Sequence, residues 1–170
     1  LKNSLSKKIF IKTLGCQMNE YDSNRILDLI KKINYYKTEN INEANCYILN
    51  TCHIREKATD KVYHDIGRVK KQFRNKLKPI VIVAGCVAQQ EGESLLRKVP
   101  ELDLVMGPQH VNNLENLLEK VDLGNQVLAT EETFISEDIT NARRESSICG
   151  WVNIIYGCNE RCSYCVVPSV

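Results

Sequence analysis

Four short apolar runs rich in Ile and Val recur along the chain, at residues 8–14, 46–50, 80–84 and 102–106. Each run ends at a break that contains Gly or Thr and leads into a segment with helical spacing, as buried strands that alternate with helices do. The helices are predicted to start near residue 22, capped by Asp22 or Ser23, and to cover residues 56–73, 93–99 and 114–121. This alternation predicts an α/β fold with a parallel sheet and right-handed crossovers.

The pattern loosens after residue 122 into a polar stretch at residues 124–147, which is typical of a linker or flap. Residues 151–156 then alternate as one new strand. We therefore expect a first domain at residues 1–123, a linker or flap at 124–148, and the start of a second domain at 149–170. Too little sequence follows this strand for an independent fold, so we expect a truncated chain, in keeping with the absence of an initiating Met.

Composition narrows the class of protein. With 43% hydrophobic and 26% charged residues, the chain has the balance of a folded globular protein and not of a disordered or collagen-like one. It has no run of about 20 apolar residues that could cross a membrane and no signal-peptide core at its start, so we predict a cytoplasmic protein. The net charge of +2 neither requires nor excludes a nucleic-acid partner.

Basic residues gather on the second predicted helix and just after it, where they suit either RNA phosphates or a solvated face. They are Lys61, Arg68, Lys70, Lys71, Arg74, Lys76 and Lys78.

Eight cysteines are the unusual feature of the composition. In a reducing compartment, clustered cysteines more often bind metal or do redox chemistry than form disulfides. Cys16, Cys52 and Cys86 each lie two residues beyond the end of a predicted strand. Because the carboxyl ends of parallel strands share one edge of the sheet, the three thiols are expected to converge in a metal centre. The alternative is that they are three small buried core residues.

A second cluster, Cys158, Cys162 and Cys165, lies on a compact loop after the strand predicted at residues 151–156. Three thiolates can hold three irons of a cubane cluster and leave the fourth iron open for a substrate. Two other chemistries fit these residues. One is a zinc site that adds Cys149 as the fourth ligand, and the other is a dithiol redox pair of Cys162 and Cys165.

The loop Gly-Cys-Asn-Glu-Arg-Cys-Ser-Tyr-Cys at residues 157–165 resembles the cysteine loop of the radical S-adenosylmethionine enzymes. Nearly the whole chain resembles one branch of them, the methylthiotransferases, through three further motifs. These are Leu-Gly-Cys-Gln-Met-Asn from residue 14, Asn-Thr-Cys-His-Ile-Arg-Glu-Lys-Ala from residue 50, and Gly-Cys-Val-Ala-Gln-Gln from residue 85. Within the branch the chain is most similar to the MiaB type, the tRNA-2-methylthio-N6-dimethylallyladenosine synthases.

This resemblance implies a methylthiotransferase amino-terminal domain, followed by the start of a radical S-adenosylmethionine partial (β/α) barrel. Two 4Fe-4S clusters and S-adenosylmethionine are the implied cofactors. Cys16, Cys52 and Cys86 would bind the auxiliary cluster, which is implicated in supplying sulfur. The second cluster would chelate S-adenosylmethionine through its open iron, with Tyr164 near the adenine. The ligands of this second cluster would be Cys158, Cys162 and Cys165.

The implied reaction converts N6-dimethylallyladenosine at tRNA position 37 to its 2-methylthio form. The C2 hydrogen of adenine is not acidic, so it calls for radical chemistry and not for general acid or base groups. The implied partners are the tRNA anticodon loop, an electron donor such as flavodoxin or ferredoxin, and a sulfur donor that the resemblance leaves open. We expect this chain by itself to be inactive. Alternatives are a relative that acts on threonylcarbamoyladenosine tRNA or on a ribosomal-protein aspartate, and a non-catalytic iron-sulfur module.

Some residues outside the cysteine triads carry weaker expectations. Cys46 and Cys149 match no ligand motif and are expected to be packing residues. Asn19 and Asn50 are expected to order the cysteine loops through side-chain bonds to the backbone. His53 is expected either near the auxiliary cluster or as an ordinary surface or capping residue.

Overall fold

The computed structural model describes residues 6–53, 58–133, 155 and 157–169. Six strands form one all-parallel sheet in the order β2-β1-β3-β4-β5-β6, so the predicted α/β class is confirmed. The strands are β1 (Lys7–Thr13), β2 (Tyr35–Lys37), β3 (Cys46–Thr51), β4 (Ile80–Gly85), β5 (Leu104–Met106) and β6 (Val127–Ala129). The helices are α1 (Gln17–Lys31), α2 (Ala58–Gln72), α3 (Cys86–Lys98) and α4 (Leu114–Asp122), with short 3-10 helices η1 (Ile41–Glu43), η2 (Pro108–Asn113) and η3 (Val167–Ser169).

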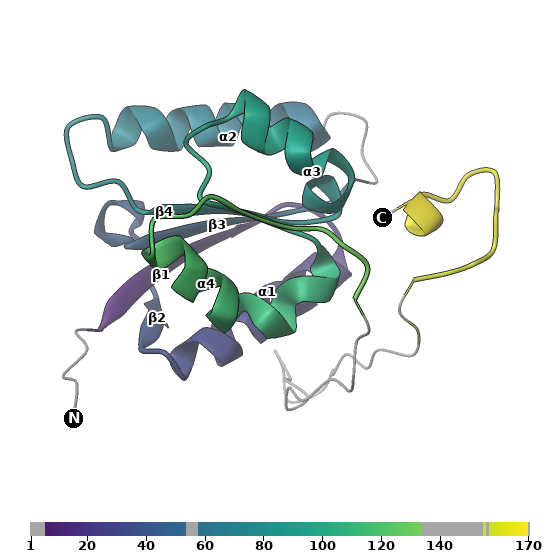
Figure 1. Cartoon of the computed structure of the whole chain (residues 1–170), viewed down its shortest axis with the longest axis horizontal. Helices are drawn as coiled ribbons and strands as arrows, with labels where there is room; N and C mark the ends of the chain where they lie inside the picture. Colours follow the sequence, from purple (N-terminus) through teal and green to yellow (C-terminus); the bar gives the residue numbers. More distant parts are fainter. Residues whose placement is uncertain (1–5, 54–57, 134–154, 156, 170) are drawn as a thin grey trace.

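Helices cover both faces of the sheet, with α1 and α4 on one side and α2 and α3 on the other (Figure 1). All six residues of the central strand β3 are buried, as expected for a parallel strand enclosed between two helical layers. Successive side chains of this strand enter opposite layers: Ile48 packs in the core that contains Ile30, and Leu49 packs in the core that contains Val62. Across the described ranges, no helix is both long and apolar enough to cross a membrane.

Two strands are absent from the sequence prediction. β2 and β6 have three residues each, too few to show an alternating pattern, and they are recognised only through their pairing with β1 and β5. β6 lies in the segment expected to be a linker, so the sheet reaches past residue 123. The rest of that segment, residues 134–148, lies outside the described residues, as does the strand predicted at 151–156 except for Ile155.

The predicted starts of two helices are wrong. α1 begins at Gln17 and its N-cap is Cys16, not Asp22 or Ser23. α3 begins at Cys86, about two turns before the predicted start, and Gly92 (φ +22°) interrupts it. The first turn of α1 is largely polar, so apolar periodicity does not mark it. The first turn of α3 is apolar and buried, but Gly92 separates it from the apolar residues of the later turns.

Candidate cysteine site at the carboxyl edge of the sheet

The sheet order places β2 on one side of β1 and β3 on the other, so the winding direction of the fold reverses between β1 and β3. Cys16 follows β1 across a two-residue turn, and Cys52 directly follows β3. Cys86 directly follows β4, the next strand along the sheet. The expected offset of two residues therefore holds for none of the three, because β1 ends one residue earlier than predicted, and β3 and β4 each run one residue further. The three cysteines nevertheless meet at the edge where open α/β sheets bind ligands.

Two glycines allow the cysteine turns to approach each other closely. A Cβ atom on Gly15 would lie 2.3 Å from the Cβ of Cys52, so the Cys16 turn packs directly on Cys52. A Cβ atom on Gly85 would lie 2.3 Å from the carbonyl oxygen of Thr51, which brings the Cys86 turn against the same loop. Both glycines have positive φ, +149° and +93°. The sequence offered a clue to these contacts, because a Gly precedes both outer cysteines.

The buried amide of Asn19 ties two of these turns together. Its Oδ1 accepts hydrogen bonds from the backbone N–H of Cys16 (3.2 Å) and from the Cys16 thiol (3.3 Å). Its Nδ2 donates to the carbonyl oxygen of Thr51 (2.8 Å) and to Oδ1 of Asn50 (3.2 Å). Two donors and two acceptors are the full capacity of an amide side chain, so Asn19 is completely satisfied although only 3% exposed.

Asn50 also donates a hydrogen bond to Asn19, and it extends the hydrogen-bond network away from the cysteines. Its Nδ2 donates to the backbone oxygen of Asn19 (2.8 Å) and to Oγ of Ser23 (3.0 Å). Ser23 in turn shares a hydrogen bond of 2.8 Å with Thr13. The expectation that Asn19 and Asn50 order the loops through bonds to the backbone is confirmed. Ser23 and Thr13 were missed, because neither lies next to a cysteine in the sequence.

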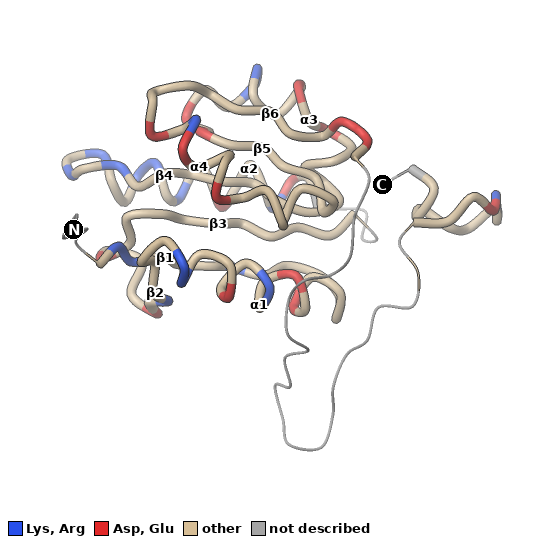
Figure 2. Tube along the Cα trace, turned by 60° about the horizontal axis from the view of Figure 1, so that its bottom comes forward, with Lys and Arg blue, Asp and Glu red and all other residues tan. Residues whose placement is uncertain are grey.

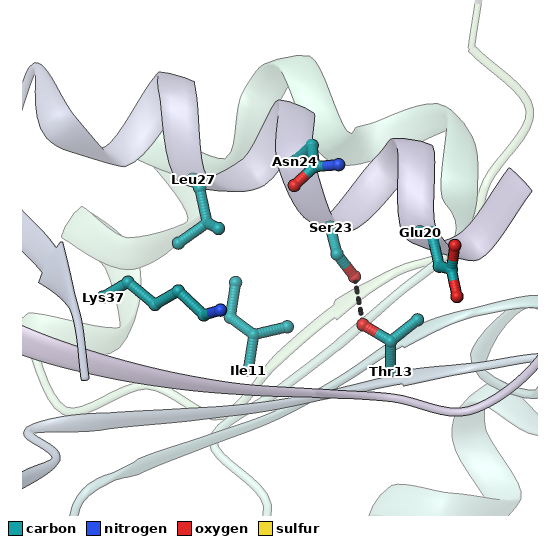
Figure 3. Close-up of a pocket in the computed structure, with 7 residues that line it drawn as sticks. All are labelled: Ile11, Thr13, Glu20, Ser23, Asn24, Leu27 and Lys37. Atoms are coloured by element: carbon teal, nitrogen blue, oxygen red, sulfur yellow. Dashed lines mark hydrogen bonds between the residues drawn. The ribbon is translucent and has the colours of Figure 1, made fainter. Parts of the chain in front are cut away.

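The outer end of this network opens into a hollow of about 110 Å³ between α1 and the sheet (Figure 3). The bonded pair Thr13 and Ser23 forms part of its wall, as the dashed line in Figure 3 shows. None of the predicted ligands lines it. The lining residues are Ile11, Thr13, Glu20, Ser23, Asn24, Leu27 and Lys37.

The groups around Cys86 shift the pKa of its thiol in opposite directions. Burial raises the pKa of Cys86, and the neighbouring Cys52, Cys16 and Asp22 raise it further. A backbone hydrogen bond from His53 to the Cys86 sulfur acts in the opposite direction and lowers that pKa. Cys16 at the N-cap of α1 and Cys86 at the first position of α3 also face the positive ends of two helix dipoles. The backbone bond and the helix ends therefore act against the burial that disfavours a negative sulfur at Cys86.

Three cysteine thiols are the kind of donor set that an iron-sulfur cluster uses, each thiol binding a different iron. Among the side chains that the structure describes, no three of His, Cys, Asp or Glu are grouped so as to hold one metal ion. The ring nitrogen Nδ1 of His53, beside Cys52, is buried and has no hydrogen-bond partner in the described ranges. An additional group at this edge would give this nitrogen a partner.

The second triad lies on the loop at residues 157–169, drawn in yellow in Figure 1. Cys162 is exposed, Cys158 and Cys165 are half-buried, and the backbone N–H of Cys165 donates to the carbonyl oxygen of Cys162 (3.1 Å). Tyr164 is 91% exposed. The loop thus presents three accessible thiols. Cys149, the fourth ligand of the zinc alternative, lies outside the described residues.

Cys46 lies fully buried in β3, in agreement with the packing role expected for it. Burial raises the pKa of this thiol far above its usual range. It faces the core on the side of α1 and α4, away from the carboxyl edge. Cys46 therefore remains a neutral thiol and is unsuited to bind a metal.

Most of the basic residues lie at the opposite end of the sheet from the cysteines, although Lys61 lies in the first turn of α2, near the Cys52 loop. α2 runs for about 20 Å away from the Cys52 loop. The last turn of this helix and the turn after it carry most of the basic residues of this set (Figure 2). Lys70 pairs with Glu101, and Lys78 pairs with Asp103 at 3.0 Å. Exposed cations without a described ion pair remain at Lys61, Lys71, Arg74 and Lys76.

Comparison with known families gives an independent finding on the same part of the chain. The sequence model of a family described as "Uncharacterized protein family UPF0004" matches residues 8–107, more than half of the 170 residues. The matched stretch contains Cys16, Cys52 and Cys86 together with the Asn19 and Asn50 network. The loop at residues 157–169 lies outside it.

Proposed function

Because the chain belongs to the UPF0004 family, whose domain is the amino-terminal domain of methylthiotransferases, we propose that it is the amino-terminal part of a tRNA methylthiotransferase. The substrate that we propose is N6-dimethylallyladenosine at tRNA position 37, converted to its 2-methylthio derivative. This choice within the family rests on the likeness of Gln17, Met18 and Asn19, and of residues 54–58, to the MiaB type.

The observation that carries the proposal is the meeting of Cys16, Cys52 and Cys86 at the carboxyl edge of β1, β3 and β4. These thiols would hold an auxiliary 4Fe-4S cluster. A second 4Fe-4S cluster that binds S-adenosylmethionine supplies, when bound, the carbon radical that can take a hydrogen from an unactivated carbon. Its ligands in our proposal are Cys158, Cys162 and Cys165, with Tyr164 near the adenine.

The chain's own residues prepare the auxiliary site before any cluster binds. Gly15 and Gly85 allow the turns to approach, and Asn19 fixes the Cys16 turn to the Cys52 loop. The helix N-termini and the His53 backbone bond favour negative sulfur and so oppose the burial that raises the pKa of Cys86. We propose a domain that continues through β6, a connection to about residue 148, and a second domain from residue 149.

The proposed partners follow from this chemistry. The exposed cations at the end of α2 suit phosphates of a folded RNA, at a distance from the reacting base that a tRNA can span. Electron transfer to the clusters requires a reductant such as flavodoxin or ferredoxin. None of the described cysteines forms a disulfide, which suits a reducing compartment such as the cytoplasm.

The first test is the iron and acid-labile sulfide content of the chain after anaerobic reconstitution. Two cubane clusters correspond to about eight irons per chain. Replacement of either cysteine triad by alanine is expected to remove about half of the iron and sulfide. Zinc without sulfide would refute the cluster assignment. Loss of all iron in only one of the two triple variants would leave a single cluster and contradict the proposed pair.

The second test addresses the substrate and uses the full-length protein with S-adenosylmethionine and a strong reductant. We expect mass spectrometry to detect the 2-methylthio product on tRNA that carries the dimethylallyl group and not on tRNA without it. Product only on threonylcarbamoyladenosine tRNA or on a ribosomal protein would reassign the substrate within the family. Bound clusters without cleavage of S-adenosylmethionine would favour the non-catalytic module. The chain by itself is expected to give no product.

A further inference from the structure

Within the described part of the chain, the Asn19 side chain is hydrogen-bonded to the Cys16 turn and to the Cys52 loop at the same time. It lies in the first turn of α1, three residues after Cys16, and its amide points back over that turn. Asn50 lies two residues before Cys52 and donates in return to the backbone of Asn19. The two amides thus form a reciprocal strap between α1 and the end of β3.

We infer that this Asn19–Asn50 strap is a positioning device that sets the separation of Cys16 and Cys52 for the auxiliary cluster. The inference rests on the proposed function and adds two residues to its site. Three hydrogen bonds from Nδ2 atoms form the strap: two run from Asn19 to Asn50 and Thr51 and one from Asn50 to Asn19, and they are 2.8–3.2 Å long.

The direction of these bonds makes an isosteric test possible. Asn19→Asp keeps the size of the side chain and one oxygen towards the backbone N–H of Cys16. It replaces the Nδ2 donor by an oxygen that faces two acceptors, the Thr51 carbonyl and Asn50 Oδ1. Asn50→Asp weakens the strap from the other side, because it removes the donor to the Asn19 carbonyl oxygen. The bond to Ser23 is lost as well, and Ser23→Ala removes that bond alone from Asn50.

Ser23→Ala is the matched control. Ser23 is 6% exposed, belongs to the same network and lies on the same helix, yet it contacts neither cysteine turn. The substitution Ser23→Ala removes two hydrogen bonds near the hollow of Figure 3, so it lowers the stability of the fold without loosening the strap. A purely structural role of the network predicts the same behaviour for all three variants.

The experiment uses the 170-residue chain with Cys158, Cys162 and Cys165 changed to Ala, so that iron reports the first triad alone. After anaerobic reconstitution, two readouts are taken: the rate of iron loss to a chelator, and the electron paramagnetic resonance spectrum of the reduced cluster. We expect N19D and N50D to lose iron about 10- to 100-fold faster and to change the spectrum, as loss of outer hydrogen bonds does at metal sites. S23A is expected to match the parent in both, with urea unfolding as the measure of its stability.

Three results would decide against the inference. Variants N19D and N50D that match S23A in rate and spectrum would show that the strap does not position the ligands. A parent chain that takes up no iron would overturn the proposed auxiliary cluster and the inference with it. If N19D does not fold, N50D alone decides, and a parent-like spectrum in it would refute the strap.

Discussion

Gly85→Ala places a methyl group in the turn between β4 and α3, where the backbone has no room for it. Gly85 has φ +93° and ψ −158°, a conformation that only glycine adopts readily, and forcing another residue into it costs about 1–3 kcal/mol. The added Cβ would also lie 2.3 Å from the carbonyl oxygen of Thr51 and 2.7 Å from Oδ1 of Asn50. Neither atom can yield freely, since one belongs to the backbone of β3 and the other to a side chain that is 1% exposed.

The chain must therefore shift the Thr51 carbonyl, which is the acceptor for Asn19 Nδ2. A lost hydrogen bond of this kind costs about 1 kcal/mol, so we expect Gly85→Ala to lower the free energy of unfolding by about 2–4 kcal/mol. The measurement is urea unfolding of the reduced, metal-free chain, followed by circular dichroism. The midpoint is expected to fall while the slope m stays constant.

Substitutions at two other glycines distinguish the effect of backbone strain from the effect of steric overlap. Gly124 has φ +87° but no atom within 4 Å of an added Cβ, so Gly124→Ala tests strain alone and is expected to cost about 1–2 kcal/mol. Gly67 lies in α2 with equally open space and without a positive φ, so Gly67→Ala is expected to stabilise by about 0.5–1 kcal/mol. If Gly85→Ala is no less stable than Gly124→Ala, the close approach of the cysteine turns is refuted.

Four further substitutions test the core, a buried ion pair and the charged surface. Burial raises the pKa of Cys46, so ionisation of this thiol at high pH favours the unfolded chain, and the free energy of unfolding falls above pH 9.0. Between pH 8 and 10 the free energy of unfolding of the parent should fall by about 1.4 kcal/mol more than that of Cys46→Ala. Equal losses would contradict the burial of this thiol. Arg25→Met removes the ion-pair partner that lies 3.2 Å from Asp22, whose side chain is 14% exposed. Urea unfolding should show a loss of about 3 kcal/mol in the free energy of unfolding, and a loss below about 1 kcal/mol would refute a structural role for the pair. Lys71→Ala and Arg74→Ala should each reduce the salt dependence of tRNA binding by about one charge; an unchanged slope in filter binding would exclude this surface as the RNA contact.

Much of the fold could be read from the sequence because its strands are buried on both faces. Apolar runs such as residues 46–50 and 80–84 are long enough to be recognised without knowing their neighbours, and their alternation with helices implies a parallel sheet. β2 and β6 escaped recognition because three residues carry no period. Their existence depends on hydrogen bonds to strands that are distant in the sequence.

The start of α1 shows the same limit at the site itself. Its first turn is polar and holds Asn19, whose buried position is explained only by its partners on β3. Apolar spacing places the helix later, because it registers contact with the core and not contact with another polar group. The cap at Cys16 therefore became visible only in the folded chain.

The sequence by itself determined the parallel α/β class, the placement of Cys16, Cys52 and Cys86 after three strands, and the likeness to methylthiotransferases. Local spacing and strand direction suffice for these conclusions, because every carboxyl end in a parallel sheet points to the same edge. The tertiary structure decided which cysteine turns touch, that Gly15 and Gly85 permit the contact, and that Asn19 and Asn50 join them. These features depend on distances between residues more than thirty positions apart, and such distances are set only when the strands pair.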